Sequence, residues 1–132
     1  NPEIVSENKL LDISNYLNVN RIDITSTDFA QAVQGAVAGD LVYFDPPYDY
    51  EEGGFTSYTS DGFSRDDLHR LKCVCDELVK TGCKVVISNN DTSFVNSLFD
   101  DKKYTINHVF AKRMINCKGQ RRKSVKEVII YG

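Results

Sequence analysis

Apolar residues recur with strand spacing in five stretches of the chain. Residues 84–88 form a continuous apolar run, which is typical of a strand buried on both faces. The run Leu41–Phe44 and residues 125–131 are also apolar, residues 104–113 alternate loosely, and residues 21–25 alternate through Ile22 and Ile24. The pattern therefore predicts five strands.

Helical spacing separates these strands. Helices are predicted over residues 1–18, from Asp28 through Phe29 to Ala36, from a capping box at Ser64 to a stop at Gly82, and around residues 94–98. Residues 49–63, 88–92 and 114–124 read as polar or basic loops, and the first of these is long enough to suggest a functional loop. This order of elements predicts an α/β fold whose sheet ends in an antiparallel hairpin.

Composition limits the class of protein. At 132 residues, with 41% apolar and 27% charged residues, the chain is expected to form one globular domain at most. No apolar run approaches the ~20 residues of a membrane span. The two histidines and four cysteines lack the spacing of metal ligands, so we expect free thiols, no metal, no membrane and a cytoplasmic location.

The net charge of −3 conceals a polarity along the chain. Residues 1–101 carry seven Lys or Arg against eighteen Asp or Glu, whereas residues 102–132 carry nine against one. A basic segment on an acidic body is typical of a surface that binds a polyanion. Charge alone is equally compatible with a solvated surface hairpin.

The junction after Leu41–Phe44 holds the most specific chemistry, the tetrapeptide Asp45-Pro46-Pro47-Tyr48. The prolines fix φ near −65° and remove two N–H donors, and an ionised Asp45 only accepts hydrogen bonds. Such a site suits an exocyclic amine on a nucleobase, with Asp45 and the Pro46 carbonyl as acceptors and Tyr48 as a stacking surface. The alternative is a Pro-Pro turn that merely ends a strand.

With these residues in view, the chain resembles the Dam-type (D12 class) N6-adenine DNA methyltransferases over most of its length. The resemblance rests on residues 40–48, which end in the catalytic Asp-Pro-Pro-Tyr motif, on residues 55–58, on residues 86–92, and on the basic residues 113–127. It implies a Rossmann-like class I methyltransferase sheet, mostly parallel, with an antiparallel C-terminal hairpin. It also implies S-adenosylmethionine as cofactor and double-stranded DNA as partner.

The resemblance assigns roles residue by residue. It implies that Asp45, Pro46, Pro47 and Tyr48 are catalytic, and that Asp45, Asp28 and Phe29 lie against the cofactor. For DNA contact it implies Tyr58, Asn89, Arg113, Asn116, Arg121, Arg122 and Lys123. The alternatives are core packing for Phe29, a helix cap for Asn89, cover of the sheet edge for Tyr58 and a solvated surface for the basic residues.

One departure from the family is large. The glycine-rich cofactor segment of these enzymes has no counterpart here, because the eight glycines never form Gly-x-Gly. We therefore expect residues 1–132 to be the C-terminal catalytic portion of a methyltransferase, inactive alone, without the cofactor segment and the target-recognition region. The alternatives are an RNA base methyltransferase and a non-catalytic, DNA-binding accessory subunit.

Overall fold

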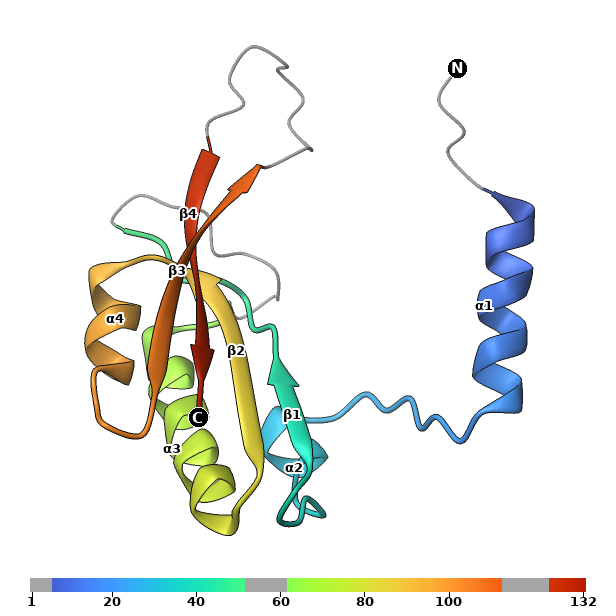
Figure 1. The fold of residues 1–132 in the computed structure, drawn as a ribbon, viewed down its shortest axis with the longest axis horizontal. Coiled ribbons are helices and arrows are strands. Elements are labelled where there is room, and N and C mark those ends of the chain that lie inside the picture. The colour runs from blue at the N-terminus through green and yellow to red at the C-terminus, as the bar shows by residue number, and fades with distance from the viewer. Residues whose placement is uncertain (1–5, 52–61, 113–123) are drawn as a thin grey trace.

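A computed structural model describes residues 6–51, 62–112 and 124–132 of the chain. This part forms four helices and four strands (Figure 1). In chain order they are α1 (Glu7–Val19), α2 (Phe29–Ala32), β1 (Leu41–Phe44), α3 (Arg65–Thr81), β2 (Lys84–Asn90), α4 (Ser93–Phe99), β3 (Thr105–Lys112) and β4 (Ser124–Tyr131).

The strands form one sheet in the order β1-β2-β4-β3. β1 and β2 are parallel, whereas β4 runs antiparallel to both of its neighbours, β2 and β3. The predicted antiparallel C-terminal hairpin is confirmed, but the prediction of a mostly parallel sheet is wrong. The reason is that the last strand inserts between β2 and β3, so two of the three described pairings are antiparallel.

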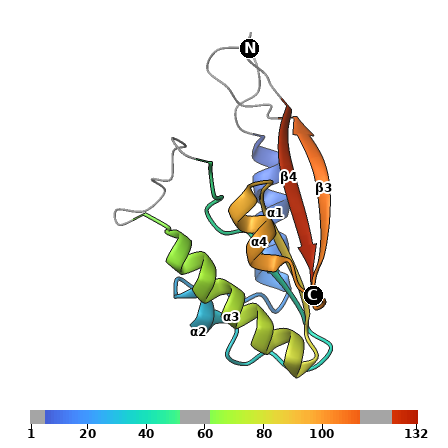
Figure 2. The same cartoon turned by 90° about the vertical axis from the view of Figure 1, so that its left-hand side faces the viewer.

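The core lies on one face of this sheet. Phe44, Ile87, Ile130 and Ile106 stand in register across all four strands. The first three are buried, and the helices α2, α3 and α4 cover this face (Figures 1 and 2). Successive side chains alternate between the faces of a strand, so the neighbouring positions point to the opposite, uncovered face.

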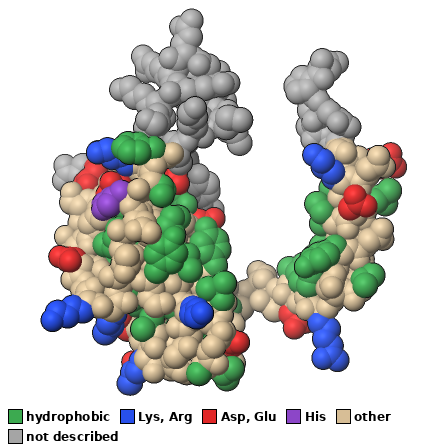
Figure 3. Space-filling view, viewed as in Figure 1, with side chains coloured by type: hydrophobic (Ala, Val, Ile, Leu, Met, Phe, Trp, Pro, Cys, Tyr) green, Lys and Arg blue, Asp and Glu red, His purple; other side chains and the backbone are tan. Residues whose placement is uncertain are grey.

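The uncovered face carries apolar side chains. Tyr43, Val86 and Tyr131 form the next row in register, and Tyr43 and Tyr131 are 58% and 42% exposed. Leu41 on the same face is 67% exposed. The space-filling view shows a band of hydrophobic side chains over β2 and β1 (Figure 3). In the described part of the chain, one side of the sheet therefore stays open to solvent.

α3 begins and ends as the sequence predicts. Ser64 accepts a hydrogen bond from the Asp67 N–H, and the Asp67 carboxylate accepts one from the Ser64 N–H, which completes a capping box. One side of α3 is apolar and faces the sheet, since Leu68, Leu71, Cys75 and Leu78 are buried and Val79 packs beside them. Gly82 ends the helix in the left-handed region, at φ 95°.

Two predicted elements differ in the structure. Residues 21–25 form no strand, because they pair with no other strand of the described residues and Ile24 is 78% exposed. The helix expected from Asp28 to Ala36 stops at Ala32 and continues as a turn, in which Gly35 is a poor helix former. Asp28 does cap this helix, accepting from the Ala30 N–H at 2.9 Å.

The remaining boundaries differ by a few residues. β2 continues to Asn90, through part of the polar loop expected over residues 88–92, because β4 pairs with it there. β3 ends at Lys112, and residue 113, the last of the predicted strand, lies outside the described residues. The short helix around residues 94–98 is confirmed as α4.

α1 stands apart from the sheet, at the end of an extended segment (Figure 1). None of its residues is buried, although it carries several large apolar side chains. Those that are 38% or more exposed are Leu10, Leu11, Ile13, Tyr16, Leu17 and Val19. The helix runs from Glu7 to Val19, and the start predicted at residues 1–3 lies outside the described residues.

Two further observations concern the class of protein. No helix among the described residues is long and apolar enough to cross a membrane. Cys73, Cys75 and Cys83 are free thiols, and burial raises the pKa of the Cys75 thiol to about 12.

Gly82 provides a test of how α3 is joined to the sheet. Any other residue at position 82 would have to adopt the left-handed backbone of Gly82, and its Cβ would approach the Ala38 Cβ to 3.1 Å. We expect Gly82→Ala to lower the free energy of unfolding by about 1–2 kcal/mol. Gly35→Ala is the matched control, because its φ is not positive and no atom lies within 4 Å of the added methyl. Equal denaturant midpoints for the two variants would contradict the strained turn.

Candidate active site

β1 delivers Asp45 to the carboxyl edge of the sheet, where ligands bind in open α/β sheets. Phe44 is buried in the core, and the next residue, Asp45, is exposed. The Asp45 Oδ1 accepts a hydrogen bond from the Ser88 Oγ at 2.6 Å. The Tyr43 hydroxyl donates to the same Ser88 oxygen at 3.0 Å. The carboxylate is thus exposed to solvent and at the same time tied to β2.

Tyr48 lies close to this group. Its ring is half-buried, and burial raises the pKa of its hydroxyl. The neighbouring Ser88 hydroxyl lowers that pKa, and the Asp45 carboxylate raises it further. These influences place the Tyr48 hydroxyl beside Ser88 and Asp45, so three side chains of the site are within electrostatic reach of one another.

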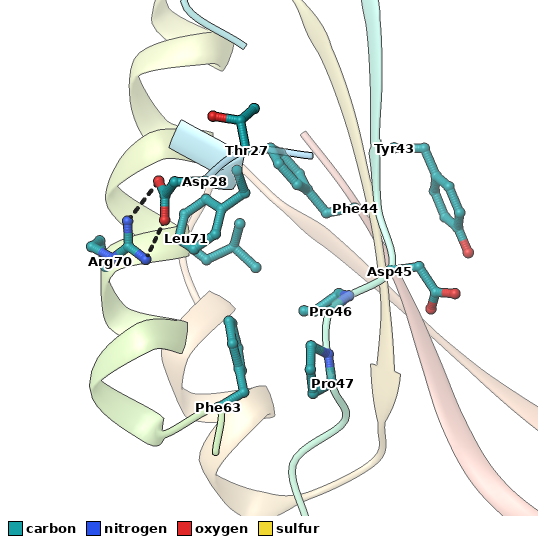
Figure 4. Close-up of a pocket in the computed structure, with 11 residues that line it drawn as sticks. Thr27, Asp28, Tyr43, Phe44, Asp45, Pro46, Pro47, Phe63, Arg70 and Leu71 are labelled. Carbon is teal, nitrogen blue, oxygen red and sulfur yellow. Dashed lines mark hydrogen bonds and ion pairs between the residues drawn. The ribbon is translucent and has the colours of Figure 1, made fainter. Parts of the chain in front are cut away.

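A cavity of about 420 Å³ lies between the end of β1 and α3 (Figure 4). Its lining includes Asp28, Phe29, Pro46, Pro47, Phe63 and Arg70. Asp45 also contributes to the lining, although Figure 4 shows its carboxylate on the other side of the strand from Asp28 and Arg70. The cavity therefore meets the tetrapeptide through its prolines.

Arg70 organises one wall of the cavity. Its two terminal nitrogens each lie 2.9 Å from an oxygen of Asp28, and its guanidinium carbon lies 4.1 Å from the centre of the Phe29 ring. The hydrogen bond from Arg70 lowers the pKa of Asp28 and keeps that carboxylate ionised. The Phe29 ring also meets Phe63 edge to face at 6.4 Å. A charged pair thus lies next to two aromatic rings.

Asp49, directly after the tetrapeptide, is buried and hydrogen-bonded through all of its polar groups. Its N–H donates to the Asn89 Oδ1 at 2.8 Å, and its carbonyl accepts from the Asn90 Nδ2 at 2.7 Å. One carboxylate oxygen accepts from the Arg65 Nε at 3.0 Å, and the other accepts from the Thr92 hydroxyl at 2.7 Å. Asp49 therefore fixes the tetrapeptide to β2, to α3 and to the start of α4.

A second contact holds the next residues of the chain. The Glu51 carboxylate accepts from the N–H and the hydroxyl of Ser93, at 2.8 and 2.9 Å, at the start of α4. The Arg65 guanidinium lies 4.6 Å above the Phe94 ring. Glu51, before positions 52–61, and Arg65, after them, are therefore both in contact with α4.

The profile of the D12 class N6 adenine-specific DNA methyltransferases matches residues 1–115. The chain belongs to this family. It is 40% identical to the type II methyltransferase M1.LlaDCHI of Lactococcus lactis subsp. cremoris, over all of the chain and 47% of that protein. It is 38% identical to the type II methyltransferase M.MjaIII of Methanocaldococcus jannaschii, over 98% of the chain and 45% of that protein.

A third relative is the retron Ec67 DNA adenine methylase of Escherichia coli, 36% identical over 83% of the chain and 36% of that protein. The chain spans less than half of the length of each of these three methyltransferases. The resemblance seen in the sequence is confirmed at the level of the family.

Several residues to which the family resemblance assigns a role come together in the structure. Asp45, Pro46 and Pro47 join Asp28 and Phe29 around the cavity. Tyr48 is adjacent, on the side of Ser88. The expected DNA contacts Tyr58, Arg113, Asn116, Arg121, Arg122 and Lys123 lie outside the described residues.

Asn89 lies beneath Asp49, the residue that follows the tetrapeptide. Its side chain is 1% exposed, and its Oδ1 accepts from the N–H groups of Asp49 and Asn90. Its buried Nδ2 has no hydrogen-bond partner among the described residues. The alternative role as helix cap falls to Thr92 instead. Asn89 therefore supports the segment after Tyr48, and direct contact with DNA stays a prediction.

The sequence alone assigned no role to several residues of this site, among them Tyr43, Asp49, Arg65, Arg70, Ser88 and Thr92. Two signals could have found two of them. Tyr43 is two positions before Asp45, which places both on one face of a strand. Ser88 follows the apolar residues of the next strand, whose carboxyl end meets that of β1 in a parallel pair. No pattern connects Arg65 or Thr92 with Asp49.

The variant Asp49→Ala tests whether the buried carboxylate holds the tetrapeptide. Because Asp49 accepts hydrogen bonds while buried, we expect its loss to lower the free energy of unfolding by about 1.5–3 kcal/mol. Glu51→Ala is the comparison, since it removes an exposed carboxylate from the same segment, and we expect a smaller loss. A urea titration measures both, and an effect of Asp49→Ala no larger than that of Glu51→Ala would contradict the assignment.

Proposed function

We propose that the protein to which this chain belongs transfers a methyl group from S-adenosylmethionine to N6 of adenine in double-stranded DNA. The observation that carries the proposal is the exposed carboxylate of Asp45 at the carboxyl end of β1, followed by two prolines and a tyrosine, in a chain of this family. We also infer that the protein works in the cytoplasm, with its described cysteines as thiols.

The chemistry of the target explains why these groups are needed. Adenine N6 is a poor nucleophile because its lone pair is delocalised into the purine ring. Hydrogen bonds from the amine to the Asp45 carboxylate and the Pro46 carbonyl direct that lone pair outward. The same two acceptors stabilise the positive charge that develops on nitrogen during transfer.

Tyr48 supplies a surface for the base. A purine in a duplex is out of reach of a strand end, so the target adenine leaves the helix before it meets Asp45. Stacking on an aromatic ring is worth ~1–3 kcal/mol per base. Because Asp49 fixes the backbone directly after Tyr48, the ring stays beside Asp45.

The cavity beside β1 is the described part of the proposed cofactor site. Its volume of about 420 Å³ is within the ~300–1,000 Å³ of small-molecule pockets, and Phe29 and Phe63 offer aromatic surface for an adenine ring. The Arg70–Asp28 pair offers charged groups beside these rings. When bound, S-adenosylmethionine supplies the electrophilic methyl group. Pro46 and Pro47 line this cavity next to Asp45, so the methyl group and the target amine meet at the tetrapeptide. The sulfur leaves as the thioether S-adenosylhomocysteine, and the methylated amine loses one proton to solvent.

The described strand ends support a DNA surface at this site. Asn90 at the end of β2 pairs with Glu127 near the start of β4, and β3 ends beside that start. Residues 113–123 therefore join the sheet at the edge where Asp45 lies. We infer that Arg113, Arg121, Arg122 and Lys123 add phosphate contacts there, which act through charge.

We infer further that residues 1–132 are the C-terminal catalytic portion of a longer, Rossmann-like methyltransferase domain. The outer edge of β1 pairs with no other described strand, and the face that carries Leu41 and Tyr43 has no helix over it. The relatives are more than twice as long as the part that this chain matches. We propose that the glycine-rich cofactor segment extends the sheet at β1 and covers this face, and that a separate region recognises the target sequence.

Asp45→Ala tests the proposed reaction in the full-length parent protein. With duplex DNA and S-adenosylmethionine carrying a labelled methyl group, we expect N6-methyladenine from the parent. The variant should lose about 10²–10³-fold in kcat, because it lacks an acceptor aimed at the developing charge. Asp100→Ala, which removes an exposed carboxylate at the end of α4, is the control that should keep full activity.

Three outcomes would overturn parts of this proposal. Unchanged activity of Asp45→Ala would exclude the catalytic role of the tetrapeptide. Transfer to RNA and not to DNA would favour an RNA base methyltransferase. DNA binding by a parent protein that transfers no methyl group to any nucleic acid would favour an accessory subunit.

Calorimetry on the 132-residue chain tests its proposed status as one portion of the domain. We expect weak or undetectable binding of S-adenosylmethionine, because the described cavity has one aromatic wall and no glycine-rich segment opposite it. Micromolar binding by the isolated chain would contradict the proposal that most of the cofactor site lies elsewhere.

A further inference from the structure

Three polar side chains of the uncovered face form a chain of hydrogen bonds that ends on Asp45. Tyr43 and Asp45 are two residues apart along the β1 segment and point to the same side, opposite Phe44 (Figure 4). The last register pair is Phe44 with Ile87, so one further step along both strands places Ser88 opposite Asp45. The local geometry of two parallel strands thus brings a serine hydroxyl to the carboxylate.

The direction of these hydrogen bonds follows from their donors. The Ser88 hydroxyl has one proton, and the carboxylate can only accept, so Ser88 donates to the Asp45 Oδ1 at 2.6 Å. Tyr43 then donates to the Ser88 oxygen at 3.0 Å. Each donor in such a chain polarises the next. Ser88 is only 3% exposed, so water does not compete freely for its hydroxyl.

We propose that Ser88 is a positioning residue that fixes the orientation of the Asp45 carboxylate, and that Tyr43 acts through Ser88. The inference rests on the proposed function, because it concerns how the acceptor of the target amine is held. The terminal torsion of an aspartate is broad, and Asp45 lies exposed beyond the end of its strand. Without a partner, its carboxylate plane would rotate.

A fixed plane matters for transfer. The Ser88 hydroxyl takes one direction of approach to Oδ1, while the Asp45 residue stays exposed on the side where the target amine arrives. The amine then meets the carboxylate in one orientation, and its lone pair is directed the same way in each turnover. Ser88 therefore contributes to kcat, whereas affinity for the cofactor does not depend on it.

The test compares Ser88→Ala, Tyr43→Phe and the double variant in the full-length parent protein. We expect kcat to fall about tenfold or more in Ser88→Ala, because a hydrogen bond to a charged group is lost. Tyr43→Phe should cost about two- to fivefold in kcat. KM for S-adenosylmethionine should be unchanged in both. In the Ser88→Ala background, Tyr43→Phe should have no further effect, since Tyr43 acts through Ser88.

Tyr131→Phe is the matched control. Tyr131 belongs to the same exposed row as Tyr43, on β4, and we expect this variant to keep the kcat of the parent. Restoring a hydroxyl with Ser88→Thr should recover most of the activity that Ser88→Ala loses. If Ser88→Ala fails to fold, as judged by its unfolding midpoint, the comparison of Tyr43→Phe with Tyr131→Phe decides alone.

A spectroscopic readout on the full-length parent protein needs no cofactor. With tyrosines labelled at Cζ, the ¹³C signal of Tyr43, assigned by its loss in Tyr43→Phe, should shift in Ser88→Ala, while that of Tyr131 should not. An unmoved Tyr43 signal overturns the hydrogen-bond chain.

The kinetic outcomes separate this inference from the proposed function. Full kcat in Ser88→Ala, or equal losses from Tyr43→Phe with and without Ser88, overturns the positioning role while an inactive Asp45→Ala upholds the proposed function. Activity that survives Asp45→Ala overturns the proposed function, and with it the role of Ser88.

Discussion

The position of the tetrapeptide Asp45-Pro46-Pro47-Tyr48 depends on the burial of Asp49. Its carboxylate is 6% exposed and holds the Arg65 guanidinium and the Thr92 hydroxyl, while its backbone bonds to the amides of Asn89 and Asn90. A buried charge is stable only when it is paired and hydrogen-bonded, so the burial of Asp49 depends on these contacts. Tyr48 precedes this anchored residue, and the tetrapeptide therefore leaves β1 along one path.

The regular elements could be predicted where local physics determines them. A capping box and a left-handed glycine set the ends of α3, and continuous apolar residues identify β1 and most of β2. Prediction failed where pairing decides. Residues 21–25 have strand alternation but no neighbouring strand among those described, whereas Asn89 and Asn90 look like a loop and are a strand because β4 bonds to them.

The site divides in the same way. Asp45, Pro46, Pro47 and Tyr48 could be found because their chemistry is contiguous in the sequence. The side chains that hold them come from residues about 40 positions later, and only the pairing of β1 with β2 brings the two groups together. Arg70 is a similar case, since its contact with Asp28 spans 42 positions and two helices. Such contacts leave no local pattern in the sequence.

Asp45 has a second effect, on how the open edge of β1 meets other molecules. An edge strand with exposed apolar side chains is a template for aggregation. The outer edge of Leu41–Phe44 pairs with no other described strand, and this strand contains no charge, proline or bulge that would discourage aggregation. Asp40 and Asp45 flank the strand as gatekeepers of like charge. Two copies that approach edge to edge therefore repel each other at both ends. The carboxylate that suits a nucleobase amine thus also protects this edge against aggregation.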